Sequence, residues 1–453
     1  MIENIDYRLA FILPRSRQLV GIEKSGAVEF PVVNVSLKER PAEQLTREIE
    51  KKWKIKTIIL DILVGTDSTT PCAVTEVRTA SWDFEREGFC IVQPEKVSES
   101  TLADSQSRSL KSILSDDDAA CGAFSRIGWI EDAQRWIQSS VKDHEVIFTE
   151  DIRQLNGGGA FCLLRLGTQS GPAYWIKGVG EPNTHEFAIT SFLAKHSPEY
   201  LPPIVATRSD WNAWVMEDFG TSLHSSNSLT DFERAAIRLA ELQKLLAGRS
   251  DELLAAQFRD HRTKTLSSHI EELIAYLGEA MRQQTSTKVP KLTEPRLRKI
   301  GAYLYDCCDA MAGQDIPDSV MHSDISPGSI LSNGTDCVFT DWCEGYVGNP
   351  FTTLEQLCVH AARKTNEAES WTRLLKQIYR SRWTSILTER QIDRAFEHLP
   401  ALSLLSYLYG RGDWLHTPRR NDPAVQSYSR SLARHMDRIV GNSDLSEVLC
   451  QPS

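Results

Sequence analysis

The stretch that decides the fold is Met321-His-Ser-Asp-Ile-Ser-Pro-Gly-Ser-Ile-Leu331, followed by Thr340-Asp-Trp342. It contains an HxD turn, a short polar loop, an apolar run and a second aspartate before an aromatic residue. This order is typical of loops that present one carboxylate as a base and another to a metal ion. One position departs from the pattern, because Ser329 stands where such loops usually carry a metal-binding Asn.

The two aspartates divide the expected chemistry between them. Asp324 is predicted to accept or orient the proton of a substrate hydroxyl. Asp341 is predicted to be the principal Mg²⁺ ligand, because hard carboxylate oxygens suit this ion. His322 is expected to brace the loop rather than act as a base, and Glu344 is expected to face solvent.

A glycine-rich run lies upstream, in Leu155-Asn-Gly-Gly-Gly-Ala160, between two strand-like stretches. Gly157, Gly158 and Gly159 can turn tightly and bring backbone N–H groups against a phosphate, because no side chain is in the way. A plain hairpin turn has the same pattern, so the run predicts phosphate binding only in combination with the residues that follow it.

Lys177 ends an apolar run, where an ammonium group is costly unless it meets a partner. Glu186, nine residues on in a helical pattern, is the natural partner. Such a pair holds a lysine against the phosphates of a nucleotide. The segment around Glu217 and Phe219 is then expected to be a hinge whose backbone groups read the base, although a surface strand end is the plainer interpretation.

Composition limits the class of protein. The 453 residues are too many for one ordinary core, and 41% hydrophobic and 25% charged residues are typical of a soluble chain. A net charge of -10 argues against a dominant nucleic-acid surface. The ten cysteines form no CxxC pair, so we expect reduced thiols. No stretch reaches the roughly 20 apolar residues of a membrane span, and no signal-peptide pattern is present, so a cytoplasmic location is expected.

The first part of the chain reads as a small α/β domain over residues 1–115. Its one helix starts after Pro41 and places Leu45, Ile49 and Trp53 on one face. The composition turns to Ser, Asp and Lys between about 95 and 120, which predicts a linker with one short amphipathic possibility around Leu110 to Leu114. Residues 116–143 are assigned to linker and lead-in helix. The expected strands cover residues 7–13, 19–22, 56–63, 73–78 and 89–92.

The second part changes from strands to helices. Residues 144–221 carry strand-like runs around one helix and are expected to form a β-rich lobe with the hinge. Residues 222–453 are mainly helical, and Thr230-Asp-Phe-Glu233 has the pattern of a capping box that opens a helix. A β-rich lobe followed by a helical lobe with a short β-containing insert is the order of a bilobal kinase. The expected helices in the second lobe cover 268–284, 294–312, 354–365, 370–387, 389–408 and 423–441.

These motifs resemble the aminoglycoside phosphotransferase family, a kinase-like group that includes choline kinases and other small-molecule kinases. His322-Ser-Asp-Ile-Ser-Pro-Gly-Ser-Ile-Leu331 is similar to the family's HGDxxPGNxL loop, and the residues from Val338 to Phe351 are similar to its xxDWxxxxxGxPxxDL segment. The resemblance implies that Asp324 is the catalytic base, that Asp341 is a metal ligand, and that ATP or GTP and Mg²⁺ are used. Its departures are Ser329, at the second metal ligand, and Thr353, at a structural Asp.

Because Ser329 stands where the family has Asn, the sequence does not decide how a second metal ion would bind. A hydroxyl is a neutral oxygen donor, weaker than a carboxylate and shorter than an amide. Metal would therefore bind through Ser329, through water, or through Asp341 alone. This departure concerns the rate of the reaction more than the fold.

The N-terminal domain has a second resemblance, to Nudix hydrolases. Arg47-Glu-Ile49 is similar to the REU part of their motif, and Glu39 falls at its earlier glutamate. Lysines repel the cation that Nudix chemistry needs, so a degenerate and catalytically silent Nudix-like domain is expected, with a chance match on an amphipathic helix as the alternative. Four positions depart from the motif: Val33 and Lys54 replace its glycines, and Lys51 and Lys52 replace its paired metal-binding glutamates.

Together the patterns predict an α+β, bilobal protein-kinase-like fold preceded by a small α/β Nudix-like domain. The expected function is an ATP- and Mg²⁺-dependent phosphotransferase acting on a hydroxyl of a small molecule, such as an aminoglycoside, a sugar or an amino alcohol. The alternative is a nucleotide-binding pseudokinase with a regulatory role. No nucleic acid or membrane partner is expected, and a homo-oligomer or a protein partner at the N-terminal domain is left open.

Overall fold

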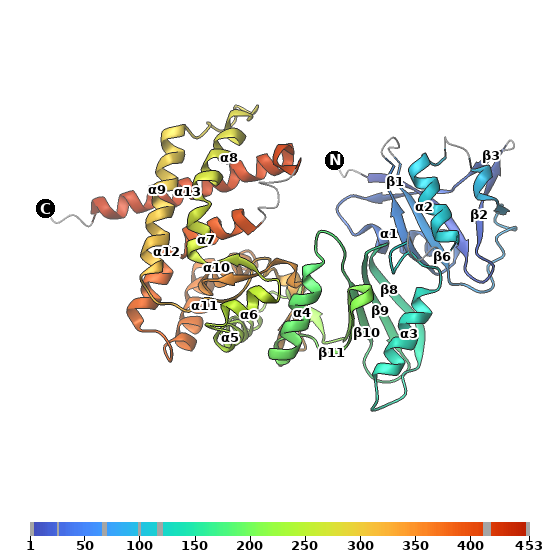
Figure 1. Ribbon diagram of the computed structural model, residues 1–453, viewed down its shortest axis with the longest axis horizontal. Coiled ribbons are helices and arrows are strands. Elements are labelled where there is room, and N and C mark those ends of the chain that lie inside the picture. Colours follow the sequence, from blue (N-terminus) through green and yellow to red (C-terminus); the bar gives the residue numbers. More distant parts are fainter. Residues whose placement is uncertain are drawn as a thin grey trace. The chain divides into compact units, whose positions relative to one another are not determined.

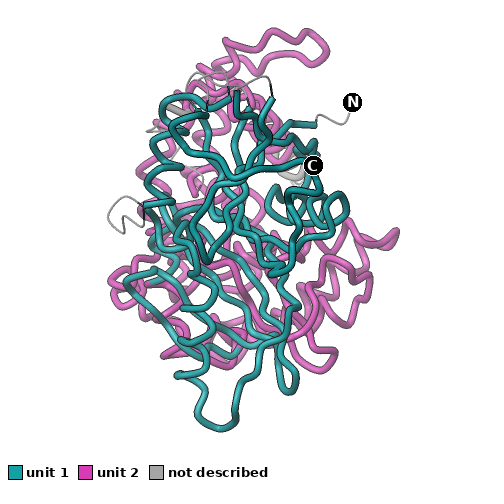
Figure 2. The backbone as a smooth tube through the Cα atoms, turned by 90° about the vertical axis from the view of Figure 1, so that its right-hand side faces the viewer, with its two compact units in different colours: residues 1–187, 203–218 teal, residues 188–202, 219–453 magenta. Residues whose placement is uncertain are grey.

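A computed structural model describes residues 4–24, 27–65, 70–97, 101–115, 121–410 and 418–449. The chain forms two compact units, coloured separately in Figure 2. Unit 1 comprises Met1–Phe187 and Pro203–Asp218, and unit 2 comprises Ala188–Pro202 and Phe219–Ser453. The N-terminal α/β segment and the strands of the expected first lobe therefore belong to one compact body.

The N-terminal segment contains a mixed seven-stranded sheet. The strand order is β3-β2-β1-β6-β5, with β4 paired to β1 and β7 paired to β2, and only β1 and β6 run parallel among these pairs. Five of the strands were expected, and β3 and β4 are additions. The strands are β1 (Asn4–Leu13), β2 (Gln18–Lys24), β3 (Ala27–Glu29), β4 (Val32–Ser36), β5 (Thr57–Leu63), β6 (Cys72–Val77) and β7 (Cys90–Val92).

Helix α1 (Pro41–Trp53) is confirmed, with a proline in its first turn. Its apolar face, formed by Leu45, Ile49 and Trp53, is buried in a core shared with Phe11. Proline suits this position because its missing N–H would have no partner inside the helix. The chain leaves the helix at Lys54, which takes the left-handed conformation, with φ of 58°.

The expected linker is wrong over much of its length. Residues Asp104–Ser115 form helix α2, and its Leu110 and Ile113 are buried. Two apolar side chains three residues apart lie on one helix face, which is enough for packing in a polar segment. Residues 116–120 lie outside the described part of the chain, and the expected lead-in helix follows as α3 (Trp129–Ser140).

The five-stranded antiparallel sheet of unit 1 has the order β11-β12-β10-β9-β8 (Figure 1). Helix α4 (His185–His196) is inserted between the third and fourth strands along the chain. Helix α3 covers this sheet through Ile130 and Ile137, which share a core with Leu164 and Val215. The strands are β8 (Phe148–Gly158), β9 (Phe161–Thr168), β10 (Tyr174–Gly178), β11 (Ile204–Arg208) and β12 (Ala213–Glu217).

Unit 2 is mainly helical, as expected, and its long helices confirm the predicted ranges. It also contains two three-stranded sheets, ordered β13-β16-β17 and β14-β18-β15. The helices are α5 (Leu229–Leu245), α6 (Ser250–Ala255), α7 (Thr263–Ser268), α8 (Ile270–Arg282), α9 (Glu294–Ala312), α10 (Phe351–Ala362), α11 (Ala368–Trp383), α12 (Glu389–Gly410) and α13 (Pro423–Leu449). The strands are β13 (Thr221–Ser222), β14 (Arg259–His261), β15 (Ser319–His322), β16 (Ile330–Ser332), β17 (Cys337–Phe339) and β18 (Gly345–Gly348).

The predicted capping box at Thr230 is wrong. Helix α5 begins at Leu229 with Ser228 as its N-cap residue, so Thr230 already lies inside the helix. The side chain of Asp231 instead accepts a hydrogen bond from the Ser226 hydroxyl at 2.6 Å. A polar loop before the helix therefore replaces the expected reciprocal cap.

The order of elements confirms the α+β, kinase-like fold class. A five-stranded antiparallel sheet with one helix between its third and fourth strands precedes a helical unit that carries short β-hairpins. Within the described residues, no helix is both long enough and apolar enough to span a membrane.

Candidate active site

Lys177 and Glu186 form a buried ion pair in unit 1. The Lys177 ammonium nitrogen lies 2.6 Å from a Glu186 carboxylate oxygen, and the two side chains are 11% and 2% exposed. Strand β10 supplies the lysine and the first turn of α4 supplies the glutamate. The lysine also lies over the ring of Trp214, 5.6 Å from its centroid. The expected partnership is present, and it fixes the lysine on the central strand of the five-stranded sheet.

The three glycines belong to the end of β8 and the turn that follows it. A side chain added at Gly157 would come within 2.9 Å of the Ile59 carbonyl oxygen. One added at Gly159 would come within 2.8 Å of the Ser125 hydroxyl and 3.2 Å of an Asp61 carboxylate oxygen. The N-terminal segment therefore approaches this turn closely, and packing against the Ile59 backbone favours glycine at Gly157 whether or not the turn binds phosphate. Contact of the turn with phosphate remains a prediction.

The expected hinge coincides with a boundary between the two units. Glu217 and Asp218 end the strands of unit 1, and Phe219 begins the second part of unit 2. The Glu217 N–H donates to the Pro203 carbonyl at 2.9 Å, and the Asp218 N–H donates to the Ala173 carbonyl at 2.9 Å. These bonds hold the backbone on the unit 1 side of the boundary. Recognition of a base by Glu217 and Phe219 remains a prediction.

In unit 2, the HxD turn follows directly from strand β15. Asp324 is exposed, whereas His322 is buried. The His322 ring lies 2.8 Å from the Thr340 carbonyl oxygen through Nε2, and its centroid lies 4.7 Å from that of Trp342. His322 therefore ties the first loop to the segment that carries Asp341. This geometry agrees with the bracing role expected for it.

Ser329 is buried and lies in a short 3₁₀ turn. Its hydroxyl lies 2.8 Å from the Asp324 carbonyl oxygen and 2.9 Å from that of Ser326, and it donates toward both. Its own carbonyl accepts a hydrogen bond from the Thr340 N–H at 2.9 Å. Ser329 thus joins the two aspartate-bearing loops without any metal. The hydroxyl keeps its lone pairs, so these contacts leave its metal role as a prediction.

Asp341 has the left-handed backbone conformation, with φ of 63° and ψ of 56°. Only a few per cent of non-glycine residues have positive φ, and such residues are often found at functional sites. The side chain is half-buried, directly after strand β17. Mg²⁺ is commonly held by one or two carboxylates together with phosphate and water. Asp341 fits this role as a single carboxylate, and no cluster of three or more His, Cys, Asp or Glu suited to a metal occurs among the described residues.

Two neighbouring residues differ from their expected roles. Glu344 is half-buried and accepts a hydrogen bond from the hydroxyl of the fully buried Tyr346, so the prediction that it simply faces solvent is wrong. Thr353 was noted only as a departure from the family pattern. Its hydroxyl accepts a hydrogen bond from the His322 N–H at 3.2 Å. A hydroxyl from α10 therefore supports the HxD turn.

The N-terminal segment places its Nudix-like positions on and just before α1. Arg47 lies 3.3 Å from the Glu39 carboxylate. Lys51 lies 3.7 Å from Glu48, and Lys52 lies over the ring of Trp53 at 4.4 Å. Both lysines are exposed. The domain's resemblance to Nudix hydrolases and its catalytic silence remain predictions.

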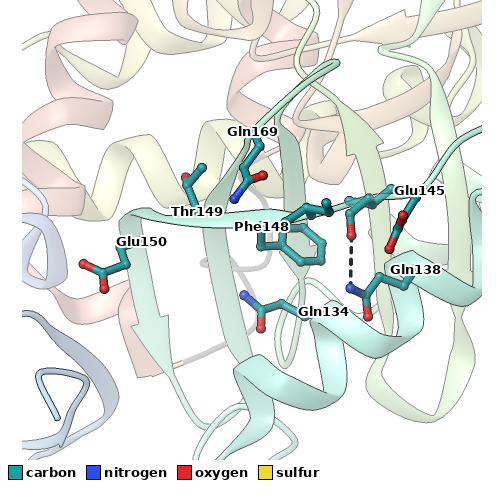
Figure 3. Close-up of a pocket in the computed structure, with 9 residues that line it drawn as sticks. Gln134, Gln138, Glu145, Phe148, Thr149, Glu150 and Gln169 are labelled. Carbon is teal, nitrogen blue, oxygen red and sulfur yellow. Dashed lines mark hydrogen bonds between the residues drawn. The ribbon is translucent and has the colours of Figure 1, made fainter.

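Two surface cavities lie outside the residues singled out by sequence. In unit 1, a cavity of about 830 Å³ lies between α3 and the start of β8 and is lined by Gln134, Gln138, Phe148 and Gln169, among others (Figure 3). One of these amides, on Gln138, donates to the Val146 carbonyl at 3.1 Å. In unit 2, a cavity of about 520 Å³ follows the hinge and is lined by small polar residues. Among the latter are Ser222, Ser225, Asp231 and Asn333.

No protein-family model matches the chain, and no curated protein matches it in sequence. Solved structures with some similarity include an ethanolamine kinase of Plasmodium vivax, with 14% identity, a TM-score of 0.42, and coverage of 62% of this chain and 81% of that one. A macrolide 2′-phosphotransferase from Brachybacterium faecium has 14% identity, a TM-score of 0.42, and coverage of 65% and 97%. A choline kinase from Cryptosporidium parvum has 11% identity, a TM-score of 0.45, and coverage of 71% and 94%. At values this low, neither a family nor an activity follows from the likeness.

Proposed function

We propose that this chain is an ATP- and Mg²⁺-dependent phosphotransferase that acts on a hydroxyl group of a small molecule. The observation that carries the proposal is the buried pair of Lys177 and Glu186 at 2.6 Å. A buried ion pair is often no more stable than apolar side chains of similar volume, so its presence calls for a reason other than stability. Holding a lysine ready for nucleotide phosphates is such a reason.

In this proposal, each candidate residue has a separate role in the reaction. Lys177, oriented by Glu186, binds the phosphates of the nucleotide. Asp324 accepts the proton of the acceptor hydroxyl while that oxygen forms a bond to the γ-phosphorus, and the bond from this phosphorus to the departing ADP oxygen breaks. Asp341 is the carboxylate that would hold Mg²⁺. Ser329 stands at the position of the second ligand, where metal would bind through its hydroxyl, through water, or through Asp341 alone. Bound Mg²⁺ neutralises phosphate charge.

The acceptor class in this proposal is an aminoglycoside, a sugar or an amino alcohol. The exposure of Asp324 supports the choice of a small molecule free in solution, because its carboxylate is open to an incoming hydroxyl. GTP is an alternative donor, because the expected hinge reads the base through backbone groups. The cytoplasm is the proposed location.

The test is incubation of the full chain with ATP, MgCl₂ and a panel of aminoglycosides, sugars, amino alcohols and nucleosides. Mass spectrometry of the small molecules measures the product. We expect one class to gain a phosphoryl group, and we expect Asp324→Asn to abolish this gain while the variant still binds ATP. If no compound is phosphorylated, or if Asp324→Asn retains full activity, the proposal is wrong.

A nucleotide-binding pseudokinase is the second candidate, and the identity of residue 329 favours it. The neutral hydroxyl of Ser329 stands where the sequence pattern expects a second metal ligand. Titration with ATP in the presence of MgCl₂ or EDTA separates the candidates. An enzyme of the proposed kind requires Mg²⁺ for tight binding and turns ATP over, whereas a pseudokinase binds ATP to a similar extent in both conditions and forms no product.

A further inference from the structure

We propose that Gln154 and strand β5 of the N-terminal segment position the glycine-rich turn of the kinase-like sheet. This inference rests on the proposed function for its effect on nucleotide binding. Its structural basis lies entirely within unit 1, where the two sheets pack through β5 and β8. Each of these strands stands at one end of its own sheet.

The contact is made by a buried side-chain amide. The Ile59 N–H donates to the Gln154 carbonyl oxygen at 2.8 Å, and the Gln154 amide nitrogen donates to the Ile59 carbonyl at 2.9 Å. The Gln154 side chain is 3% exposed. The amide therefore takes the place of a neighbouring strand and satisfies both backbone groups of Ile59. Leaving such buried groups without partners is costly.

Both strands are irregular at this contact. The pairing of β5 with β6 shifts register between Ile59 and Asp61. The pairing of β8 with β9 shifts register between Gln154 and Asn156, immediately before the glycines. A β-bulge bends its strand and changes the direction of the residues that follow. The amide therefore holds β8 at the bend that sets the course of the turn.

Further contacts continue along the turn. The Phe124 N–H donates to the Gly159 carbonyl at 3.3 Å. The buried Ser125 hydroxyl donates to the Asp61 carboxylate at 3.0 Å, and this pair lies beside Gly159. The turn is thus held at its start by Gln154 and at its end by residues 122–125. Both sets of contacts come from chain that precedes the kinase-like sheet, which gives the N-terminal segment a role without catalysis of its own.

The effect on the reaction follows from precise placement. Backbone N–H groups bind phosphate well only when the turn is already in position, and small displacements are costly for phosphoryl transfer. Loss of the amide contact is expected to weaken nucleotide binding and leave acceptor binding unchanged. Gln154 is in this sense a positioning residue.

The experiment compares Gln154→Met with a matched control, Glu150→Gln, in the full chain. Methionine has a similar length but cannot bond to Ile59. Glu150 also lies on β8 and forms an exposed ion pair with Lys56 at 3.2 Å, so its substitution alters the same pair of segments without touching the buried contact. We expect Gln154→Met to raise KM for ATP by about tenfold with an unchanged KM for the acceptor, and Glu150→Gln to change neither.

Hydrogen exchange measured by mass spectrometry supplies a readout that does not need activity. In Gln154→Met we expect faster exchange in residues 155–163, with wild-type exchange in unit 2. Wild-type exchange in residues 155–163, or an unchanged KM for ATP in an active enzyme, would overturn the inference. If Gln154→Met loses protection throughout the chain, the experiment is repeated with Ser125→Ala. This second variant is judged by the same two measurements, exchange in residues 155–163 and KM for ATP. If the wild-type chain binds no nucleotide, the proposed function fails, and the exchange data alone decide whether Gln154 positions the turn.

Discussion

The candidate residues of unit 1 and those of unit 2 are held in different ways. In unit 1 the functional side chains, Lys177 and Glu186, bind each other in a buried position. In unit 2, Asp324 is exposed and is positioned through its backbone, by contacts that involve His322 and Ser329. The difference teaches that loss of a charge has separate consequences in the two units. We expect such a loss to lower both stability and the proposed activity in unit 1, and to lower the proposed activity alone in unit 2.

The largest effect is expected for Asp341→Asn. Asparagine tolerates the left-handed conformation of this position, so the fold is retained while the charge is lost. Loss of a metal-holding carboxylate is expected to lower kcat by about 10³ and to leave the melting temperature unchanged. Steady-state kinetics and thermal unfolding measure the two quantities.

The matched control for this variant is Asp315→Asn. Asp315 is exposed and, like Asp341, has the left-handed backbone conformation, with φ of 51°, and it lies outside the loops of the site. We expect wild-type kinetics from it. A large drop in the melting temperature of Asp341→Asn would remove the contrast between the two units.

The next effect is the loss of stability in Lys177→Met. Glu186 would then be a buried carboxylate without its ammonium partner, which costs about 3–5 kcal/mol in comparable pairs. The double variant Lys177→Met with Glu186→Leu is expected to recover most of this stability and still bind ATP weakly. Urea unfolding and nucleotide titration measure the two properties.

An exposed ion pair provides the control for Lys177→Met. Lys24 lies 3.3 Å from Glu29 with side chains 70% and 51% exposed, so Lys24→Met should change stability by about 0.5 kcal/mol or less. Tight ATP binding by the double variant would show that the buried pair has no role at the phosphates.

A smaller effect is expected for Ser329→Ala. Its hydroxyl is used to join the two loops, so we expect a loss of about 1 kcal/mol of stability and little change in the Mg²⁺ concentration required for activity. Kinetics over a range of MgCl₂ measure this requirement. If Ser329→Ala needs a much higher Mg²⁺ concentration for activity, Ser329 is a metal ligand. One side chain of unit 2 would then both bind the metal and join the two loops.

The smallest effect concerns His360 on α10. Burial lowers the pKa of this imidazole, Arg363 lowers it further, and the negative charge of Asp324 opposes both. Asp324→Asn removes a charge that favours the protonated imidazole, so the pKa of His360 should fall further in this variant. An NMR titration of the ring protons measures the shift. An unchanged or raised pKa would show that Asp324 does not act on this side of the loop.

Predictability differed between elements for physical reasons. Residues Leu45, Ile49 and Trp53 have helical spacing on a polar background, and α1 follows from them. The Ser-rich segment that forms α2 has few apolar residues, so local pattern indicated a linker. Its helix depends on burial of Leu110 and Ile113 against the rest of unit 1. The capping pattern at Thr230 was overridden by the polar loop before α5.

The candidate site shows the same limits. The pairing of Lys177 with Glu186 could be predicted because a charge at the end of an apolar run needs a partner nearby in sequence. The roles of Thr353 and Gln154 could not, because their contacts join residues 31 and 95 positions apart. Gln154 carries neither a charge nor a motif that marks it, and Thr353 is marked only as a departure from the family's motif.

By itself the sequence determined the kinase-like order of elements, the HxD loop with its second aspartate, and the lysine and glutamate that pair. These follow from local periodicity, charge and motif spacing, which depend on neighbouring residues. Only the tertiary structure decided that the N-terminal segment packs on the glycine-rich turn, that Ser329 joins the two aspartate loops, and that Glu344 bonds to Tyr346. These contacts depend on which side chains and backbone groups meet in the folded chain, and the spacing of residues along the sequence does not specify that.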